Sequence, residues 1–545
     1  MNLDSLFLGG RLNHLSNYFS TSYLAIFLPL AMLIYSIVPQ KLKRYTLLIL
    51  SFGFFWLISG KLVLVLAVTI LSVHYFGLWL DRLINERKST VKQCEDKELK
   101  KKIKIQYQKK MRAVVGLAAV VHVGMLLVIK YTAFFTGNIN SLLSAVGLSI
   151  QLAIPKYVMP IGISFFTMQA MSYIFDVYRG KIKADGNLVR VALFMSFFPQ
   201  IVEGPICRYS DTADKLWNVT KIDYDNMAMG IRRIAFGLMK KAIVADRLNS
   251  AVSEIFAHYD KYDGGIMVLG AVLYTIQLYM DFSGSMDAVT GTGYIFGVIM
   301  PENFQRPFFS KSVSEFWKRW HITLGTWFRD YIFYPVSMSK PMKKLTAASR
   351  KKIGNRYGPL TAGAVALFCV WSLNGLWHGA AWSYIFYGMY HFVMILTGNI
   401  VEPLAEKFNK KLHLNPENFF YKGFKIIRTT VFVVFGELFF RAPGLDAGFG
   451  MCKIMFTSFT LKSINLATLD SLKLDKYDLI VVGVVLLIVF VVSILNERGK
   501  DVNGTLAKQK LPVRWLVTLA MIMFVIICAA YGTGYAPVEP MYADF

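Results

Sequence analysis

The chain has 545 residues, of which 55% are hydrophobic and only 17% are charged, and its formal net charge is +26. Soluble globular proteins carry about 25% charged residues, and the apolar residues here come in long blocks, which excludes a soluble multidomain protein. The positive charge lies in short segments between these blocks, as the positive-inside rule requires, so we expect no nucleic-acid partner. We predict an all-α, polytopic membrane bundle that forms one domain over residues 1–545.

The apolar blocks predict where the chain crosses the membrane, because a spanning helix needs about 20 mostly apolar residues. The clearest blocks, in chain order, are 23–38, 45–59, 62–80, 113–135, 267–282, 360–376, 382–396, 429–440, 479–495 and 515–530. Weaker or interrupted blocks are 142–154, 157–177, 189–201, 229–244 and 288–300. We expect about ten to fourteen spans, together with re-entrant and interfacial helices that do not cross.

The distribution of charge predicts how these spans are oriented. Residues 81–112 contain 12 Lys and Arg against 5 Asp and Glu, and residues 340–356 contain seven Lys and Arg and no acid. We place both segments in the cytoplasm as basic loops, because positively charged loops stay on that side. Counting spans from these loops puts the N-terminus and the C-terminal segment 532–545 outside.

Residues 312–335 predict a helix at the membrane surface. Ser312 and Glu315 have the spacing of a capping box, so the helix is expected to begin at Ser312. Large apolar side chains then recur at helical spacing on one face, and Lys and Arg lie between them: Phe316, Trp320, Leu324, Trp327 and Tyr331. A helix rich in Trp and Arg lies in the interface plane rather than crossing the bilayer.

His321 lies inside this predicted helix, directly after Trp320. The residues alone leave two interpretations open. His321 is either a structural hydrogen-bonding group in a packed aromatic helix or a functional group, since imidazole changes its protonation near neutral pH. Trp320 is a candidate for a supporting role beside it.

His378 lies where one apolar block ends and the next begins, in the stretch VWSLNGLWHGAAWS (370–383). An ionisable side chain at membrane depth is costly, so it is a candidate functional residue. The usual pKa of histidine, about 6.5, also suits proton transfer near neutral pH. The alternative is a buried structural histidine beside the small-residue packing pair formed by Gly375 and Gly379.

Two neighbours of His378 are candidates for supporting roles. If the stretch is helical, Asn374, His378 and Trp382 align at a spacing of four, and Asn374 could hold one imidazole nitrogen. Asn374 and Trp377 are also the candidates for stabilising an oxyanion, because both side chains carry N–H donors.

Several carboxylates are embedded in apolar surroundings, and most are expected to form structural ion pairs: Asp176, Glu203, Asp246, Asp281, Asp287 and Glu437. Glu437 and Arg441 lie four apart and are expected to pair on one helix. Asp281, at the end of a span, is the best of these carboxylates for a role in supporting the site. The sequence contains no nucleotide-binding loop and no carboxylate at ligand spacing from the histidines, so we expect neither a bound cofactor nor a metal site.

Taken together, several segments resemble the membrane-bound O-acyltransferase family, in its bacterial branch that acetylates alginate and other exopolysaccharides. They are MPIGISFFTMQAMSYIFDVYRG (159–180), FMSFFPQIVEGPICRY (194–209), GLMKKAIVADRL (237–248), YMDFSGSMDAVTGTGYIFGVIMPENFQRPF (279–308), SVSEFWKRWHITLGTWFRDYIFYP (312–335), NGLWHGAAW (374–382) and GTGY (532–535). Seven segments in the same order are a specific signal.

The resemblance implies that His378, in Leu-Trp-His-Gly, is the catalytic histidine and that His321, in Arg-Trp-His, is the second characteristic polar residue. It also implies acetyl-CoA as the acyl donor, a glycan outside the cytoplasm as the acceptor, a separate extracytoplasmic partner transferase, and the bacterial cell membrane as the location. The segments YPVSMSKPMKK and SGSMD depart from the pattern typical of exopolysaccharide acetylases, which leaves the particular substrate open.

Three other functions remain as alternatives. D-alanyl transfer to teichoic acid fits the same family, but the length and motif order are closer to the polysaccharide acetylases. A transporter or flippase for a lipid-linked sugar fits the many spans and broken helices, yet no internal repeat is visible. The transporter also leaves the Leu-Trp-His-Gly stretch around His378 unexplained. A non-catalytic scaffold of a cell-wall complex predicts that alanine at His378 changes assembly or abundance rather than acylation.

Overall fold

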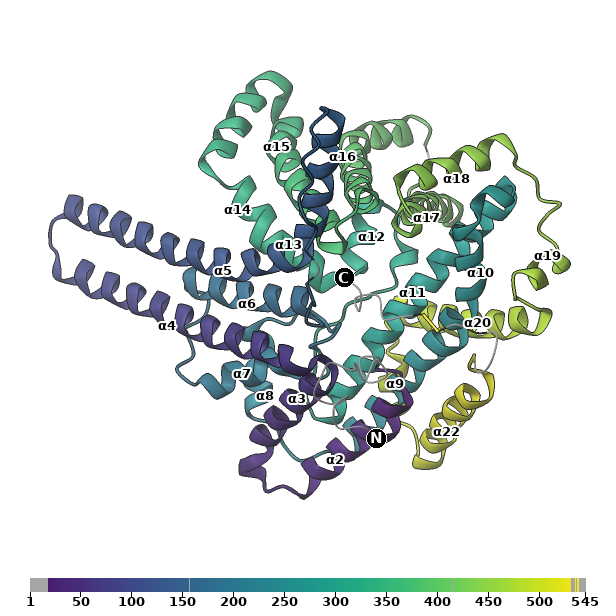
Figure 1. The fold of residues 1–545 in the computed structure, drawn as a ribbon, viewed down its shortest axis with the longest axis horizontal. Coiled ribbons are helices and arrows are strands. Elements are labelled where there is room, and N and C mark those ends of the chain that lie inside the picture. Colours follow the sequence, from purple (N-terminus) through teal and green to yellow (C-terminus); the bar gives the residue numbers. More distant parts are fainter. Residues whose placement is uncertain (1–17, 156, 414, 531–534, 536, 539–545) are drawn as a thin grey trace. The chain divides into compact units, whose positions relative to one another are not determined.

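The computed structural model describes residues 18–530, apart from 156 and 414, together with residues 535, 537 and 538. These residues form helices and connecting loops without a β-strand (Figure 1), so the predicted all-α class is confirmed. They divide into two compact units: unit 1 holds the described residues of 1–230 and 292–301, and unit 2 holds those of 231–291 and 302–541. The prediction of a single membrane domain stays a prediction. Residues 532–534 of GTGY, and both chain ends, lie outside the described residues.

Unit 1 contains the described helices up to α8, including two short helical turns, η2 (Gln40–Leu42) and η3 (Gly60–Leu62). Its helices are η1 (Ser22–Phe27), α2 (Leu28–Ile37), α3 (Lys43–Ser59), α4 (Val63–Gln93), α5 (Lys97–Ala145), α6 (Ile163–Tyr178), α7 (Leu188–Ser196) and α8 (Tyr209–Trp217). Helix α9 (Tyr224–Leu238) begins in unit 1 and ends in unit 2.

The basic segment 81–112 is a helical hairpin rather than the predicted loop. It is formed by the end of α4 and the beginning of α5, which lie side by side (Figure 1), and only residues 94–96 between them are not helical. The Asp96 carboxylate caps α5 by accepting hydrogen bonds from the backbone N–H groups of Glu98 (2.9 Å) and Leu99 (3.2 Å). Lys, Arg and Glu are good helix formers, so a charged segment needs no loop when a cap is available.

Seven described helical segments are long and apolar enough to cross a membrane, and they make this a multi-pass membrane protein: Gln40–Gln93, Lys97–Ala145, Gly264–Ile295, Lys340–His378, Trp382–Lys411, Lys476–Glu497 and Leu511–Cys528. The number is lower than the predicted ten to fourteen. Blocks 45–59 and 62–80 belong to one continuous segment, and block 23–38 forms only a shorter apolar helix. Block 429–440 lies in α17 (Phe419–Arg441), which is not among the seven, and the interrupted blocks 157–177 and 189–201 lie mostly in the short helices α6 and α7.

Helix α6 shows how an interrupted block is accommodated. Gly162 precedes it with φ 76°, and a Cβ at this position would lie 2.0 Å from the Ile201 carbonyl oxygen, so only glycine fits. All of α6 except Phe175 and Tyr178 is buried. The protein thus covers this broken part of the chain, as the interruption predicts.

Unit 2 contains the remaining described helices, including two short helical turns, η5 (Tyr259–Lys261) and η6 (Pro307–Phe309). The others follow in chain order. They are η4 (Met239–Ala245), α10 (Asp246–Ala257), α11 (Gly264–Ile295), α12 (Val313–Arg319), α13 (Ile322–Phe328), η7 (Arg329–Phe333), α14 (Tyr334–Ser337), α15 (Lys340–His378), α16 (Trp382–Lys411), α17 (Phe419–Arg441), α18 (Leu445–Thr457), α19 (Leu466–Ser471), α20 (Lys476–Glu497), α21 (Val502–Ala507) and α22 (Leu511–Cys528). The last residues of α11, 292–295, belong to unit 1.

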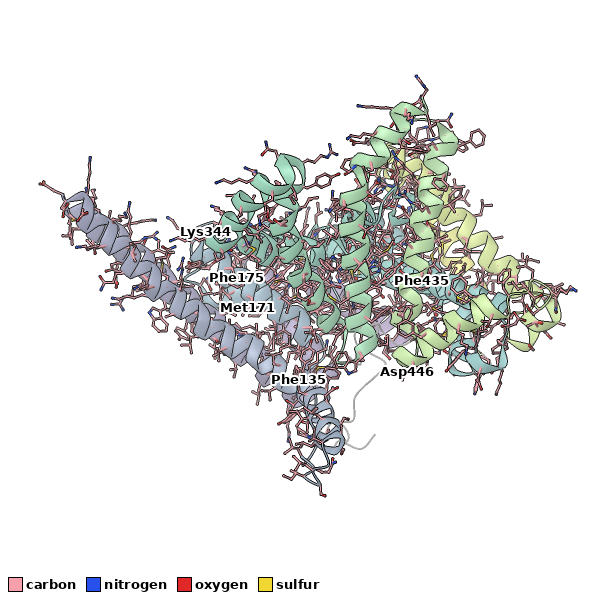
Figure 2. All side chains as sticks on the ribbon, turned by 90° about the horizontal axis from the view of Figure 1, so that it is seen from above. Phe135, Met171, Phe175, Lys344, Phe435 and Asp446 are labelled. Atoms are coloured by element: carbon pink, nitrogen blue, oxygen red, sulfur yellow. The ribbon has the colours of Figure 1, made fainter. Side chains whose placement is uncertain are left out.

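The second basic segment, 340–356, is also helical rather than a loop. It forms the first part of α15, where Figure 2 labels Lys344, and it is separated from the apolar part by a kink at Gly354, which has φ 81°. Trp371 of α15, Ile395 of α16 and Val313 of α12 form a buried apolar cluster. Further aromatic packing holds α17 to α16: the ring of Phe435 (Figure 2) lies 5.6 Å from that of Tyr390.

Candidate active site

His378 is the last residue of α15 and is 6% exposed. Asn374, one turn earlier, is equally buried, so the predicted shared face of these two residues is confirmed. The predicted alignment with Trp382 is wrong, because the chain leaves the helix at Gly379 and Trp382 begins α16 with 56% of its surface exposed. The Asn374 Oδ1 atom accepts no hydrogen bond in the described structure. That Asn374 holds one nitrogen of the His378 imidazole stays a prediction.

Glycines bring α15 and α16 into close contact beside His378. A Cβ on Gly375 would lie 2.5 Å from the Tyr384 carbonyl oxygen, and a Cβ on Gly388 would lie 2.4 Å from the Trp371 carbonyl oxygen. The predicted packing role of Gly375 is therefore confirmed, and its partner helix is α16. This close contact between the two helices positions the backbone around His378.

We expect Gly375→Ala to force α15 and α16 apart, because the new methyl group would meet backbone atoms that cannot rotate away. Overpacking of this kind costs about 1 to 3 kcal/mol, so the yield of monodisperse protein in detergent and its thermal unfolding temperature should both fall. Gly363→Ala is the matched control, since no atom lies within 4 Å of its Cβ position on the same helix. Equal behaviour of the two variants would contradict the close contact.

Aromatic rings surround the imidazole of His378. Its ring centroid lies 5.0 Å from that of Trp377, 5.1 Å from that of Phe440 and 6.1 Å from that of Tyr387. Phe440 comes from α17 and Tyr387 from α16, so three helices of unit 2 converge on this residue. A water-poor surrounding of this kind strengthens electrostatic interactions with a reacting group.

His321 lies at a break in the predicted helix 312–335. The helix begins where predicted, since the Ser312 hydroxyl accepts a hydrogen bond from the Glu315 backbone N–H at 3.1 Å. It does not continue as one helix: α12 ends at Arg319, His321 has φ 45°, and α13 starts at Ile322.

The reason for the break is a preceding loop that pairs with this part of the chain. The Gln305 N–H donates to the Arg319 carbonyl at 2.9 Å, and the Ile322 N–H donates to the Asn303 carbonyl at 3.0 Å. These bonds replace bonds within the helix. The five apolar residues of the predicted face are nevertheless all buried: Phe316, Trp320, Leu324, Trp327 and Tyr331.

The structure brings His321 and His378 to the same indole ring. The centroid of His321 lies 5.7 Å from that of Trp377, the residue next to His378. Burial lowers the pKa of His321 well below its usual range, and the neighbouring His378 lowers it further. Trp377 thus packs against both candidate histidines, whereas the ring of Trp320 packs against that of Phe304 at 5.0 Å. Supporting roles for both residues stay predictions.

His391 is a third histidine in this region, and the sequence analysis did not single it out. It is fully buried on α16, its ring lies 4.7 Å from that of Tyr387, and its Nδ1 atom accepts a hydrogen bond from the Trp317 indole N–H at 3.2 Å. The rule that marked His378, an ionisable residue within an apolar block, also marks His391.

Asp281 does not contact either candidate histidine through its carboxylate. It pairs with Lys241 at 2.8 Å, and Lys241 also contacts Asp246 at 2.9 Å. The neighbouring residue, Phe282, is the one that reaches the site, with its ring 4.8 Å from that of His321. The structure thus places Asp281 in a buried ion network with Lys241 and Asp246. Asp281 lies on the same helix as Phe282, α11.

Other predicted ion pairs are confirmed in part. Asp287 pairs with Arg233 at 3.1 Å and also with Lys240. The pair of Glu437 with Arg441 is wrong, since Arg441 donates instead to the Ser253 hydroxyl at 3.3 Å and forms no ion pair with Glu437 among the described residues.

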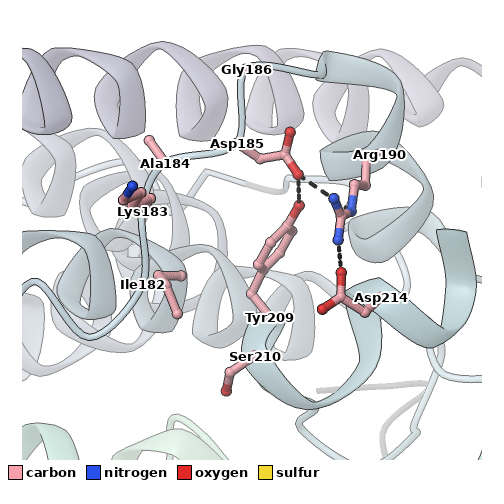
Figure 3. Close-up of a pocket in the computed structure, with 9 residues that line it drawn as sticks. All are labelled: Ile182, Lys183, Ala184, Asp185, Gly186, Arg190, Tyr209, Ser210 and Asp214. Carbon is pink, nitrogen blue, oxygen red and sulfur yellow. Dashed lines mark hydrogen bonds and ion pairs between the residues drawn. The ribbon is translucent and has the colours of Figure 1, made fainter.

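A separate cavity of about 440 Å³ in unit 1 has a lining without histidine (Figure 3). Its charged groups are held by one another: Asp185 accepts from Tyr209 and pairs with Arg190, which also pairs with Asp214. These four side chains thus form one polar network within the lining. Among the described residues, no group of three or more His, Cys, Asp or Glu side chains could hold a metal ion.

Comparison with known proteins identifies the class of enzyme. Residues 58–349, more than half of the chain, match the model of the membrane-bound O-acyltransferase family; His321 lies inside this match and His378 beyond it. The chain is 31% identical over 458 residues to the probable alginate O-acetylase of Azotobacter vinelandii, covering 84% of this chain and 81% of that protein.

Two relatives with other acceptors also align. The teichoic acid D-alanyltransferase of Bacillus subtilis is 34% identical over 287 residues, which are 51% of this chain and 68% of that protein. The peptidoglycan O-acetyltransferase of Helicobacter pylori is 28% identical over 376 residues, which are 64% and 65% of the two chains. The chain therefore belongs to the membrane-bound O-acyltransferase family and is a multi-pass membrane O-acyltransferase.

Proposed function

We propose that the protein transfers an acetyl group from cytoplasmic acetyl-CoA to hydroxyl groups of a polysaccharide or other cell-envelope glycan outside the cytoplasm, with His378 as the general base. The observation that carries this proposal is the convergence of His378 and His321 on Trp377 inside a buried aromatic shell. The 31% identity to an alginate O-acetylase supports acetyl as the acyl group and a polysaccharide as the acceptor.

The position of His378 along α15 supports an acceptor that arrives from outside. The first part of α15, 340–353, carries the basic residues that we place in the cytoplasm. From Gly358 to His378 the helix rises about 30 Å at 1.5 Å per residue, which is the thickness of the hydrocarbon core, about 30 Å. His378 then lies near the outer leaflet, where a glycan can reach it. The outside location of both chain ends rests on the charge of the loops alone and is part of the proposal.

The reaction requires one base and one leaving group. His378 accepts the proton of the acceptor hydroxyl while the hydroxyl oxygen bonds to the thioester carbonyl carbon. The carbon–sulfur bond then breaks, and the departing thiolate takes up the proton, so an ester and free CoA are formed. Trp377 has an N–H group beside His378 and is the candidate for stabilising the oxyanion; Asn374, also buried there, is the second candidate.

The basic residues of the cytoplasmic segment fit the acyl donor. Lys and Arg side chains of 340–356 favour the phosphates of acetyl-CoA on the cytoplasmic side. The acceptor is a polymer, and a separate extracytoplasmic transferase is the partner that would complete delivery to it. The family membership favours an enzyme over a flippase or scaffold.

D-alanyl transfer is the second candidate, because the aligned part of the chain is 34% identical to a teichoic acid D-alanyltransferase. The chemistry at His378 would be the same, with D-alanine in place of acetate. The two candidates therefore differ in the released acid rather than in the geometry of the site.

The acyl-ester content of the cell envelope tests both candidates. We expect the deletion strain to lose base-released acetate, measured by mass spectrometry, and the complemented strain to recover it. A fall in base-released D-alanine instead would favour the second candidate. If neither acid changes while the protein is abundant in the native strain, both proposals are wrong.

A further inference from the structure

Asn303 makes an unusual set of contacts beside His321. Its Oδ1 atom lies 3.1 Å from the Thr323 backbone nitrogen, 2.9 Å from the Thr323 hydroxyl oxygen and 3.1 Å from Nδ1 of His321. Both Asn303 and His321 are 2% exposed, so water does not compete for these contacts. One amide oxygen thus faces three polar groups of the same turn.

The backbone contact decides which atom of the amide faces the turn. A backbone N–H can only donate, so the atom opposite Thr323 must be the oxygen of Asn303 rather than its NH₂ group. The NH₂ group points the other way, 3.2 Å from the sulfur of Met286, which is a weak acceptor. An amide oxygen can only accept, so Nδ1 of His321 must carry the hydrogen.

A neutral imidazole carries one hydrogen, so the Nε2 atom of His321 holds a lone pair. The pKa of His321 is lowered by burial and by His378, which keeps the ring neutral near pH 7. His321 also has φ 45°, a conformation that costs energy for a residue with a side chain. The contacts of Asn303 with Thr323 and Ile322 hold the turn in this conformation.

We propose that Asn303 is the positioning residue of His321: it holds the hydrogen on Nδ1, so that His321 takes part in acyl transfer as a hydrogen-bond or proton acceptor through Nε2 and not as a donor to the oxyanion. The role of His321 in acyl transfer rests on the proposed function. The tautomer itself follows from the contacts of Asn303. With the hydrogen on Nδ1, the Nε2 atom has none to donate, so groups other than His321 must stabilise the oxyanion.

The charged side chains near His321 are mostly paired with one another, and His378 is the neighbour whose charge changes the pKa of His321. On α11, Asp281 is held by Lys241, and Asp287 is held by Arg233 and Lys240. On α12, Arg319 is held by Glu315 and Glu497, and Lys318 precedes it. On α15, His378 is the titratable group whose charge lowers the pKa of His321. A new charge at position 303 would therefore act on His321 directly.

Asn303→Asp and Asn303→Leu separate this role from a merely structural one. A carboxylate at this position still accepts from Nδ1 and favours the charged ring, so an opposite charge should raise the pKa of His321 by about 1 to 3 units. The acidic limb of the activity profile should move to higher pH by the same amount, because the acceptor nitrogen is lost to protonation sooner. Leucine has a similar size but accepts no hydrogen bond, so the rate should fall by about 100-fold.

The measurement uses the full chain in proteoliposomes, with acetyl-CoA as the donor, alginate as the acceptor probe, and released CoA thiol as the signal. Asn409→Asp and Asn409→Leu are the matched controls, because Asn409 is buried on α16 and its Oδ1 atom accepts a hydrogen bond from the Tyr421 hydroxyl at 3.0 Å rather than from a histidine. Neither control should move the pH profile. An Asn303→Asp profile that coincides with the native one would overturn the proposal.

A second measurement needs no substrate and no variant at position 303. Nitrogen-15 spectra of protein labelled at histidine, with the His321 signals identified by their loss in His321→Gln, report which ring nitrogen carries the hydrogen. Hydrogen on Nδ1 is expected, and hydrogen on Nε2 would overturn the proposal even if the Asn303 variants fail to fold. Hydrogen on Nδ1 without any acetyl transfer would leave the tautomer intact and count against the proposed function alone.

Discussion

Replacement of His378 by alanine is expected to lower the rate of acyl transfer by about 100-fold or more, because a positioned general base contributes about 10² to 10⁴ in rate. Without the imidazole, the acceptor hydroxyl keeps its proton and is a poor nucleophile. The rings of Trp377 and Phe440 remain on both sides of the position, so the fold should survive the loss. The readouts are base-released acetate from cells and CoA release from acetyl-CoA, each at matched membrane abundance.

His122→Ala provides the matched control for the loss of a buried imidazole. His122 is fully buried on α5, in unit 1, and its ring nitrogen lies 3.3 Å from the Ser72 hydroxyl. This variant should keep its transfer activity. If His378→Ala transfers acetate as fast as His122→Ala does, then His378 is a packing residue and the general base lies elsewhere.

Replacement of Lys241 by methionine should have the largest effect on stability. The Lys241 side chain is 2% exposed and contacts the carboxylates of Asp281 and Asp246 at 2.8 and 2.9 Å, and its ammonium also donates to the Val538 carbonyl at 2.6 Å. Removing the cation leaves two carboxylates in a site where they cannot be hydrated. Breaking a buried ion pair in this way costs about 3 to 5 kcal/mol, which should appear as a lower unfolding temperature in detergent.

Neutralising the two carboxylates that Lys241 contacts should recover part of the stability lost in Lys241→Met. In Lys241→Met combined with Asp281→Asn and Asp246→Asn, no uncompensated charge stays buried, so the unfolding temperature should rise above that of Lys241→Met. Arg356→Met is the surface control, since Arg356 and Glu406 are both more than half exposed and such pairs contribute about 1 kcal/mol or less. A triple variant less stable than Lys241→Met would show that the lysine acts through something other than charge compensation.

The sequence was most informative where neighbouring residues decide the structure. Ser312 begins a helix as predicted, because a cap acts on backbone groups only a few residues away. Burial of the apolar face from Phe316 to Tyr331 was also predictable from its spacing. The same reasoning failed at His321, where the competing hydrogen bonds come from Asn303 and Gln305, in a separate loop.

Composition and block length were sufficient to predict a helical membrane protein, because lipid forces every backbone polar group in a span to be satisfied within a helix. The motif order was sufficient to indicate the acyltransferase family. The tertiary structure was needed to bring His321 and His378, 57 residues apart in the chain, to one indole ring. It also decided that Asp281 pairs with Lys241 and that Asn303 faces His321. Such contacts depend on how helices and loops pack in space, and spacing along the chain carries no information about them.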